Sequence, residues 1–590
     1  MTERPATGRG PSETGGGTNG RWPGVRAGLA SALPLLTLPA LFVGSDPPPP
    51  LRVFQVFAGP LAVLGTAAFG LACLASAPRV AAAAARFREQ GRSWLAGRRG
   101  VVLVFLIALA ALSLVRAQLI SSRADDPRRE YLLTGDEPSY LLLTHSLVFD
   151  GDLNLYNNRE QNDGRYFYSR PLLGPGQFGF AYYNRLADGR LSGREAEWVG
   201  REYLINRPGL PILIAPAYWL GFHAGLRIRF AVLVWLNVMG AAVVALMFLL
   251  ARTVSGEPVA SAGAAFLLGF TPPLLYYPSQ IFPEIPGALF LTGALYGLLR
   301  GQGRPAVLIV GLLLGFLPWL QERFLGTTAV LLGAGLARAP VRRHVVWLAA
   351  PVALSLLLQA RYYWEFYAAP LPLGGMKLMA AAALPRGLLA MLTDRDRGIL
   401  LINPLLIVAG VGLGFLWYRA RWLAATIVAV LLVYLSPVAA FADWHGGVCP
   451  PLRYVTAVTP LLVGPLVVLL TAPGWPLTRL AIGVLGAWAL WLGVTVTSQP
   501  ALLFWKYGAV FNPSALRAAH PFFPGYFHPS PGSVGRSLLW LALLAAWPML
   551  DAALGRAGAS VTGRRATGWF PLILAVGLLA VSLGSAALSR

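Results

Sequence analysis

Two adjacent carboxylates, Asp136 and Glu137, are the residues of this sequence best suited to acid–base chemistry. They follow a long apolar segment that ends near Ile120. A carboxylate close to a hydroxyl group can take its proton as a general base. The same residues also suit a helix start, with Asp136 as N-cap and Pro138 in the first turn. The two interpretations are compatible, because one residue can cap the helix while the other catalyses.

The segment after this pair predicts a short helix and a turn. Residues 139–149 form an amphipathic pattern that suits a helix lying on a membrane surface. The Asp-Gly-Asp-Leu-Asn run of residues 150–154 resembles a calcium loop, but Leu155 and Gln161 stand where an EF-hand needs glycine and glutamate. We therefore favour a turn that ends the surface helix.

A third carboxylate, Glu284, closes the polar run of residues 276–284 at the mouth of two apolar segments. An ionisable group at membrane depth is costly, and it is a functional candidate for that reason. In the headgroup layer the cost would vanish, so a structural role is the alternative. Glu322 and Arg323 are predicted to pair with each other at a helix end.

The loop of residues 444–454 is rich in Gly, Pro and aromatic residues and contains Arg453. Its backbone N–H groups and guanidinium suit close approach to an anion. An interfacial aromatic belt with a snorkelling arginine is the alternative. No metal site is predicted at His445, which lacks further ligands at helical spacing. Cys73 and Cys449, the two cysteines of the chain, imply no disulfide framework.

The elements that must position these residues are transmembrane helices. Of the 590 residues, 56% are hydrophobic and only 12% are charged, and the mean hydropathy is +0.59. This composition excludes a soluble globular protein and indicates an all-α polytopic membrane protein with about 13–15 spans. The net charge of +23 is scattered through short loops, so it favours a role in membrane topology over nucleic-acid binding.

Membrane sidedness follows from the arginines. The basic loop between the second and third spans is predicted to be cytoplasmic, so the third span runs outward and delivers Asp136 and Glu137 to the outer face. The predicted spans lie near 25–43, 53–77, 100–120, 229–251, 258–275, 284–300, 305–320, 324–337, 344–359, 398–417, 422–441, 454–472, 476–497, 536–554 and 569–588.

Whether the Pro-rich segment 207–222 crosses the membrane decides the direction in which every later span crosses it. If it crosses the membrane, the basic connections 338–343, 419–421 and 556–565 all fall outside, whereas an interfacial segment places all three inside. We therefore predict a re-entrant or in-plane segment. The segments then placed on the outer face are 121–206, 276–284, 321–323, 361–397, 443–454 and 498–536.

The chain divides into four predicted regions. Residues 1–23 form a disordered cytoplasmic tail, and residues 24–99 form a helical hairpin followed by the basic loop. Residues 100–497 form the catalytic core, which includes a large outer loop at 121–228. Residues 498–590 contribute an outer loop and the last transmembrane helices.

Several of these motifs occur in a set order on one predicted face. They are the Asp136-Glu137 pair with Tyr140, the Arg-Pro-Gly-Leu-Pro segment 207–211, Glu284, and the Trp-His-Gly-Gly to Pro-Leu-Arg-Tyr loop 444–454. Together they resemble the GT-C superfamily of integral-membrane glycosyltransferases, which includes protein mannosyltransferases and the lipid A aminoarabinose transferase. The loop is similar to one in bacterial members of unassigned specificity.

The resemblance covers roughly residues 100–460 and implies a polyprenyl-phosphate-linked sugar donor with inverting transfer outside the cytoplasm. It implies Asp136 as the base and Arg453 as a contact of the donor phosphate. It also suggests Arg323 or Arg207 as a further contact of the donor phosphate. Tyr140 and His445 are additional candidates for substrate binding. Two departures are the additional hairpin before residue 100 and the inserted Cys-Pro-Pro-Leu of residues 449–452.

We therefore expect a glycosyltransferase at the outer face of the cytoplasmic membrane, acting on a glycan, lipid or protein acceptor. Asp136 is the expected base, with Glu137 and Glu284 as acceptor-positioning or metal-assisting carboxylates. The cofactor is unknown, and the need for a divalent cation stays open. The alternatives are a lipid-linked polysaccharide polymerase or ligase, and a transporter or lipid flippase. A transporter would carry charges in the middle of its spans and contain inverted repeats.

Overall fold

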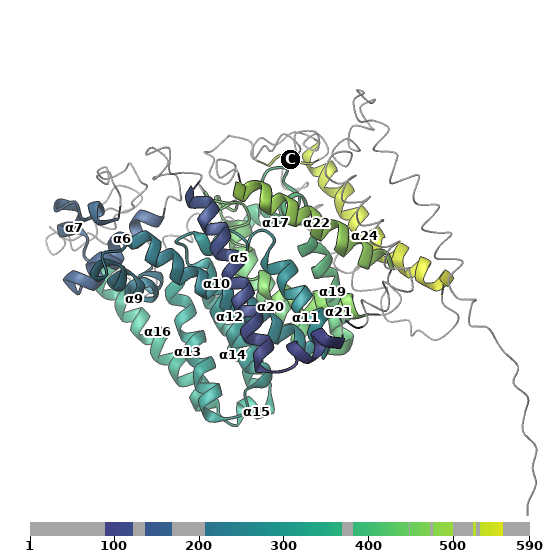
Figure 1. Ribbon diagram of the computed structural model, residues 1–590, viewed down its shortest axis with the longest axis horizontal. Helices are drawn as coiled ribbons and strands as arrows, with labels where there is room; N and C mark the ends of the chain where they lie inside the picture. The colour runs from purple at the N-terminus through teal and green to yellow at the C-terminus, as the bar shows by residue number, and fades with distance from the viewer. Residues whose placement is uncertain are drawn as a thin grey trace, which may run out of the picture.

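The computed structural model describes residues 86, 89–121, 136–167, 207–367, 381–447, 449–472, 476–498, 523–526 and 532–558, and all regular elements in these ranges are helical. The helices in Figure 1 are α5 (Arg98–Ser121), α6 (Glu137–His145), α7 (Tyr156–Glu160), α9 (Gly209–His223), α10 (Ile228–Ser255), α11 (Pro258–Gly269), α12 (Glu284–Arg300), α13 (Arg304–Leu320), α14 (Phe324–Leu336), α15 (Ala339–Arg342), α16 (Val345–Tyr367), α17 (Leu384–Thr393), α18 (Ile399–Ile402), α19 (Leu405–Arg419), α20 (Arg421–Ala440), α21 (Val463–Thr471), α22 (Pro476–Ser498) and α24 (Ser533–Gly558). Short turns of other helix types are η4 (Ser146–Asp150), η5 (Asp163–Tyr166), η6 (Tyr277–Ser279), η8 (Ala381–Ala383) and η9 (Thr459–Leu462).

The helices fall where the sequence predicts spans, with two interruptions. The predicted span 398–417 is divided into α18 and α19 at Asn403 and Pro404, because the residue before a proline is disfavoured in helical conformation. The predicted span 454–472 begins as a loop and becomes helical only in η9 and α21. The spans predicted near 25–43, 53–77 and 569–588, and the N-terminal tail, lie outside the described residues.

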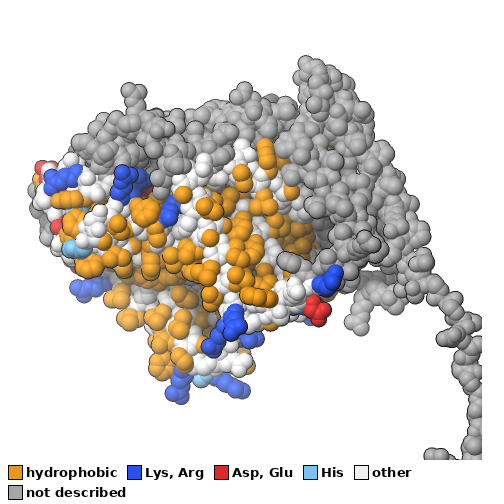
Figure 2. Space-filling model, viewed as in Figure 1, with side chains coloured by type: hydrophobic (Ala, Val, Ile, Leu, Met, Phe, Trp, Pro, Cys, Tyr) orange, Lys and Arg blue, Asp and Glu red, His pale blue; other side chains and the backbone are white. Residues whose placement is uncertain are grey.

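The chain is an all-α polytopic membrane protein. Four described helices, α5, α10, α16 and α20, are long and apolar enough to cross a bilayer, and seven shorter apolar helices accompany them. Figure 2 shows the broad apolar surface that these helices present. The Pro-rich helix α9 has 15 residues, or roughly 22 Å, which is less than the roughly 30 Å of a hydrocarbon core. Its interfacial placement stays a prediction.

Helix α10 is the centre of the bundle. In its most apolar window 67% of the residues are buried, against 22% in α5 and 17% in α16, so these two helices form the periphery. It packs against α5, α9, α11, α12 and α21. Lipid tails are as apolar as the helices, so helices in a bilayer associate mainly through close packing, which small residues permit. Gly240 lies against Pro278, and Gly269 lies against Val244.

Arginines join neighbouring segments at one end of the bundle. At the basic end, defined by Arg252, Arg338 and Arg419, each guanidinium donates to a backbone carbonyl of a neighbouring segment. Arginine is visible at the lower edge of the apolar surface in Figure 2. Described parts of the segments predicted to be on the outer face, from 276–284, 321–323, 361–397, 443–454 and 498–536, contact one another. Their position outside the cytoplasm stays a prediction.

The contact between α17 and α20 allows a test of this packing. A Cβ atom added to Gly387 would lie 1.8 Å from the carbonyl oxygen of Ala439. Gly387→Ala should therefore lower the free energy of unfolding by about 1–3 kcal/mol, as overpacked cores do. Gly410→Ala in α19 is the matched control, because its Cβ meets nothing within 4 Å; that change should be neutral or stabilise by up to about 1 kcal/mol. Thermal unfolding in detergent would measure both, and equal stability of the two variants would contradict the packing.

Candidate active site

Asp136 occupies the N-cap position of α6, as predicted, but its side chain makes no capping hydrogen bond. Instead, Oδ2 accepts a hydrogen bond of 2.6 Å from Nη2 of Arg453, which lies 317 residues away in the sequence. The Asp136 side chain is 37% exposed. The helix start therefore fixes the backbone of Asp136 and leaves its carboxylate available for other contacts.

Arg453 uses each of its nitrogen atoms. Besides Asp136, it donates from Nε to Oε1 of Glu284 at 3.0 Å and from Nη1 to the carbonyl of Gly446 at 3.2 Å. Its guanidinium lies 4.0 Å from the centroid of the Phe282 ring. The three residues Asp136, Glu284 and Arg453, which the sequence placed on one face, are thus in direct contact, well within the roughly 15 Å that a shared reacting centre would require.

Glu284 is the first residue of α12, and its side chain is fully buried. Its Oε1 also accepts a hydrogen bond of 2.7 Å from Nη2 of Arg323. The predicted pairing of Glu322 with Arg323 is therefore wrong, because the buried Glu284 carboxylate takes Arg323. Glu322 pairs with Arg207 instead, whose guanidinium stacks 4.6 Å from the centroid of a tyrosine ring.

The four charged groups form one chain of contacts, Asp136–Arg453–Glu284–Arg323, which we call the carboxylate–guanidinium cluster. It contains two negative and two positive charges. Buried charges are costly unless they are paired and hydrogen-bonded. Asp136 is the only member with substantial exposure, since the Arg453 and Arg323 side chains are each 9% exposed and Glu284 is 0% exposed. The cluster therefore presents a single carboxylate to any substrate.

Glu137, adjacent to Asp136 in the sequence, points to a different partner. Its Oε1 accepts a hydrogen bond of 2.5 Å from Nε of Arg229, and the side chain is 1% exposed. Tyr140, one turn further along α6, is also buried, and Nε2 of Gln321 donates to its hydroxyl at 3.4 Å. In this structure Glu137 and Tyr140 anchor α6, and their predicted contacts with substrate stay predictions.

Helix α6 is more deeply buried than the sequence predicts. The amphipathic pattern suggests one face on a membrane surface, but all nine residues of α6 are buried. The reason is tertiary packing, since α6 contacts α9 and η5. The turn predicted after it is confirmed, with Gly151 in the left-handed conformation at φ 75°. Asp150 accepts hydrogen bonds from the amides of Asn157 and Asn158, which gives it a structural role.

The loop that carries Arg453 is shaped by unusual backbone angles and buried hydrogen bonds. Gly446 has φ 93°, and the non-glycine Leu452 has φ 63°, a conformation that costs energy and is often found at functional sites. The hydroxyls of Tyr276 and Tyr277 donate to the carbonyls of Pro451 and Pro450, at 2.6 and 2.7 Å. These contacts attach the loop to the segment just before Glu284.

Cys449 lies in the same loop and is buried. Its Sγ donates to the carbonyl of Gly446 at 3.0 Å. Burial raises the pKa of this thiol. The carbonyl of Cys449 accepts a hydrogen bond of 2.7 Å from Nη1 of Arg397. The carbonyl of Gly446 also accepts a hydrogen bond from Arg453. Cys449 is therefore bonded to Arg397 directly and to Arg453 through the Gly446 carbonyl.

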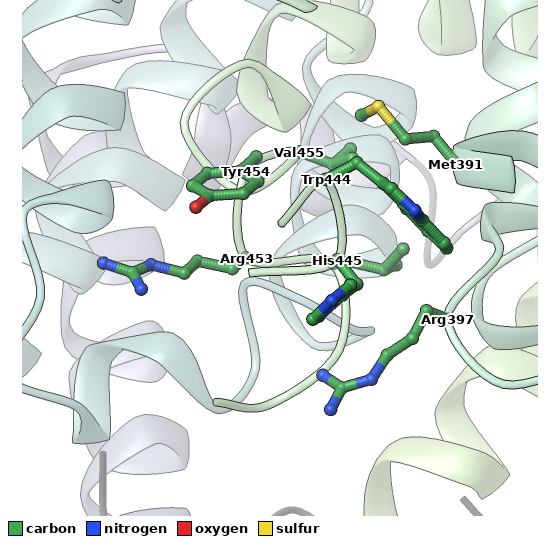
Figure 3. A pocket seen from close by; sticks show the side chains of 8 residues that line it. Met391, Arg397, Trp444, His445, Arg453, Tyr454 and Val455 are labelled. Atoms are coloured by element: carbon green, nitrogen blue, oxygen red, sulfur yellow. The ribbon is translucent and has the colours of Figure 1, made fainter. Parts of the chain in front are cut away.

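A small pocket adjoins the cluster (Figure 3), and both of its charged lining residues are arginines. In Figure 3 Arg453 extends away from His445 and Arg397, so the two guanidinium groups lie on different sides of the loop. The pocket is lined by Met391, Arg397, Trp444, His445, Leu452, Arg453, Tyr454 and Val455. Arg397 and the neighbouring aromatic rings give this pocket a lining that suits an anion.

His445 is held neutral at this pocket. Its Nδ1 accepts the backbone N–H of Gly447 at 3.1 Å, and its Nε2 lies 3.5 Å from a carboxylate oxygen of Asp443. Burial, and then the positive charge of Arg397, lower the pKa of His445 to about 4. With Nδ1 as acceptor, Nε2 carries the proton, so His445 is a hydrogen-bond donor at neutral pH.

This lowered pKa predicts a pH dependence of stability. Between about pH 6.5 and pH 4 the unfolded chain binds a proton at His445 that the folded protein does not bind, so stability should fall as the pH falls, by up to about 1.4 kcal/mol per unit. Replacing His445 by Asn should remove this contribution. Unfolding curves at about pH 7.5 and pH 5 would test it: the wild type should lose about 1–2 kcal/mol more than the variant, and parallel losses would contradict the assignment.

Two residues of the site were not singled out from the sequence, Arg229 and Arg397. Arg229 is the partner of Glu137, and its place at the start of an apolar helix near the outer face was the available signal. Arg397 belongs to the run Asp-Arg-Asp-Arg of residues 394–397 between two apolar segments. The two carboxylates and two guanidinium groups of this run were the available signal in the sequence.

Among the described residues, no group of three or more His, Cys, Asp or Glu side chains is arranged to hold a metal ion. Asp136 and Glu284 are joined by Arg453, and Glu137 by Arg229. The carboxylates of the site thus use arginine as their counter-ion in this structure. The predicted metal-assisting role of Glu137 and Glu284 stays a prediction.

No protein-family model and no curated protein matches the sequence. Among solved structures, the chain is similar to the oligosaccharyltransferase of Archaeoglobus fulgidus in its apo form, with 14% identity and a TM-score of 0.38 over 76% of this chain and 58% of that one. It is also similar to ArnT from Cupriavidus metallidurans bound to undecaprenyl phosphate, with 14% identity and a TM-score of 0.39 over 83% of this chain and 78% of that one. The chain thus spans less than two thirds of the oligosaccharyltransferase.

Proposed function

We propose that this protein transfers a sugar from a polyprenyl-phosphate-linked donor to an acceptor hydroxyl at the outer face of the cytoplasmic membrane. The observation that carries the proposal is the exposed carboxylate of Asp136, held by a buried arginine cluster beside a pocket whose charged residues are both cationic. A base for the acceptor and cations for the donor are the two groups that such a transfer needs. The family resemblance of the motifs agrees with this reaction.

The proposed transfer is a direct displacement that needs no covalent intermediate between the sugar and the protein. Asp136 removes the proton of the acceptor hydroxyl as its oxygen attacks the anomeric carbon of the sugar. The bond between that carbon and the phosphate oxygen breaks, and polyprenyl phosphate leaves as an anion, with inversion at the sugar. In this proposal Arg397 and His445, which line the pocket, stabilise the leaving phosphate. Arg453 holds Asp136 in place and adds positive charge beside it.

The positions of the charged residues in the cluster favour a transferase over a transporter. The members of the carboxylate–guanidinium cluster lie at helix starts or in loops of the described residues: Asp136 before α6, Glu284 at the start of α12, and Arg323 before α14. A transport pathway would place such groups near the middle of spans. A polymerase or ligase would share the donor chemistry, and the acceptor product of the reaction distinguishes it.

Lipid binding tests the proposal directly. Purified protein in nanodiscs is mixed with undecaprenyl phosphate or with undecaprenol, and the complexes are measured by native mass spectrometry. The phosphate should bind, and the alcohol should bind at least about tenfold more weakly, because charge-assisted hydrogen bonds are lost. Arg397→Gln should reduce the difference. Equal binding of the two lipids by the wild type would refute a phosphate-linked donor.

A further inference from the structure

The loop between α17 and α18 contains a carboxylate that the proposed reaction does not use. Asp394 is fully buried. Its Oδ1 accepts the backbone N–H groups of Asp396 and Arg397, each at 2.8 Å, and its Oδ2 accepts the backbone N–H of Tyr526 at 2.8 Å. One carboxylate therefore fixes the backbone of a pocket arginine and a segment 132 residues further along the chain.

The turn at Asp394 leaves little freedom to Arg397. Gly398 closes it, and a Cβ atom there would lie 2.5 Å from the backbone N and O of Asp394. The backbone N–H of Gly398 donates to the Asp394 carbonyl at 2.9 Å. From this turn Arg397 reaches the carbonyl of Cys449, in the loop that carries Arg453. The direction of the Arg397 side chain into the pocket thus depends on the turn at Asp394.

The same turn is attached to residues 523–526, which precede α24. The backbone N–H of Arg395 donates to the Pro524 carbonyl at 2.9 Å, and Nη2 of Arg386 donates to the Tyr526 carbonyl at 3.1 Å. Beside these contacts, the Tyr526 hydroxyl lies 2.6 Å from Oγ of Ser537 in α24. The segment 523–526 is therefore bonded both to the turn and to the last described helix.

We propose that Asp394 is a positioning residue for Arg397, through which the C-terminal segment 523–526 sets the geometry of the anion pocket. The inference rests on the proposed function for the identity of the anion, a lipid-linked phosphate. It extends the active unit beyond residue 497, although all residues proposed to touch substrate lie before residue 460. Asp394 itself contacts no substrate and acts through the backbone of its neighbours.

A double-mutant cycle separates positioning from general stability. Asp394→Asn keeps one oxygen acceptor but sets an NH2 group against a backbone donor. It should weaken undecaprenyl phosphate binding about tenfold, and Arg397→Gln should weaken it at least as much. The double variant should bind no more weakly than Arg397→Gln alone, because both changes remove the same contact. Additive losses, or no loss in Asp394→Asn, would overturn the inference.

Ser537→Ala is the matched control. It removes the hydroxyl that contacts Tyr526 and Thr393 in the same region but leaves the three hydrogen bonds of Asp394. This variant should lower the melting temperature slightly and bind the lipid as the wild type does. If its affinity fell as far as that of Asp394→Asn, the effect would be one of local stability, and the positioning role would be refuted.

Hydrogen exchange of the ligand-free protein distinguishes failure of this inference from failure of the proposed function. Asp394→Asn should increase exchange at the amides of residues 396–397 and 526 and in peptides covering 449–455, whereas Ser537→Ala should leave 449–455 unchanged. Unaltered exchange in 449–455 of Asp394→Asn would overturn the coupling. The expected exchange pattern together with a wild type that does not bind undecaprenyl phosphate would overturn the lipid-linked donor alone.

Discussion

Replacing Asp136 by Asn should abolish sugar transfer while leaving expression and folding intact. The amide cannot accept a proton, so the rate should fall by the roughly 10²- to 10⁴-fold that a general base contributes, or more. The Asn oxygen can still accept the hydrogen bond from Arg453, and the side chain is 37% exposed, so little stability should be lost. Incorporation of labelled sugar into acceptor, normalised to folded protein, measures the effect.

The control for this prediction is Asp152→Asn. Asp152 is an exposed carboxylate in the same polar segment, and it accepts a hydrogen bond from Ser146, the first residue of η4. It lies outside the carboxylate–guanidinium cluster, so its replacement should leave transfer nearly unchanged. Retained transfer in Asp136→Asn would remove Asp136 as the base, and equal losses in both variants would point to a general effect of the segment.

Replacing Glu284 by Ala should destabilise the protein strongly. The fully buried Glu284 accepts hydrogen bonds from Arg323 and Arg453. Its loss removes the carboxylate partner of Arg323 and leaves Arg453 with Asp136 as its remaining carboxylate partner. Removing one partner of a buried ion pair typically costs about 3–5 kcal/mol. Thermal or denaturant unfolding in detergent should show this loss, and transfer should fall with it because Arg453 is no longer fixed.

A second substitution separates charge from cavity effects in this experiment. In the double variant Glu284→Gln with Arg323→Met, one negative and one positive charge are removed together, and a side chain of suitable volume fills the space. This variant should recover at least half of the lost stability relative to Glu284→Ala. If it were as unstable as Glu284→Ala, the shape of the site rather than its charge balance would be responsible.

Much of the fold was predictable from the sequence because long apolar segments have only one way to cross a bilayer. The predicted span 284–300 coincides with α12. The proline at position 404 was also a local signal for the break between α18 and α19. It was missed because an apolar run of suitable length suggests a continuous helix.

The partners within the site were less predictable. Asp136 and Arg453 are 317 residues apart, and sidedness alone places both on one face without pairing them. Glu322 and Arg323 are neighbours, so the sequence suggested a local pair, whereas burial of Glu284 made Arg323 its partner. Which arginine pairs with which carboxylate depends on which groups the fold buries together. The spacing of residues along the sequence does not contain that information.

The buried thiol of Cys449 gives this loop a built-in reporter. The thiol group is closed off while it donates to Gly446, and alkylation requires the loop to open. A small water-soluble alkylating reagent can therefore be used in a variant with Cys73 replaced by Ser. The rate at which it modifies Cys449 reports how often the segment that carries Arg453 opens. Protection by a bound lipid would then measure occupancy of the pocket through a cysteine that the chain already carries.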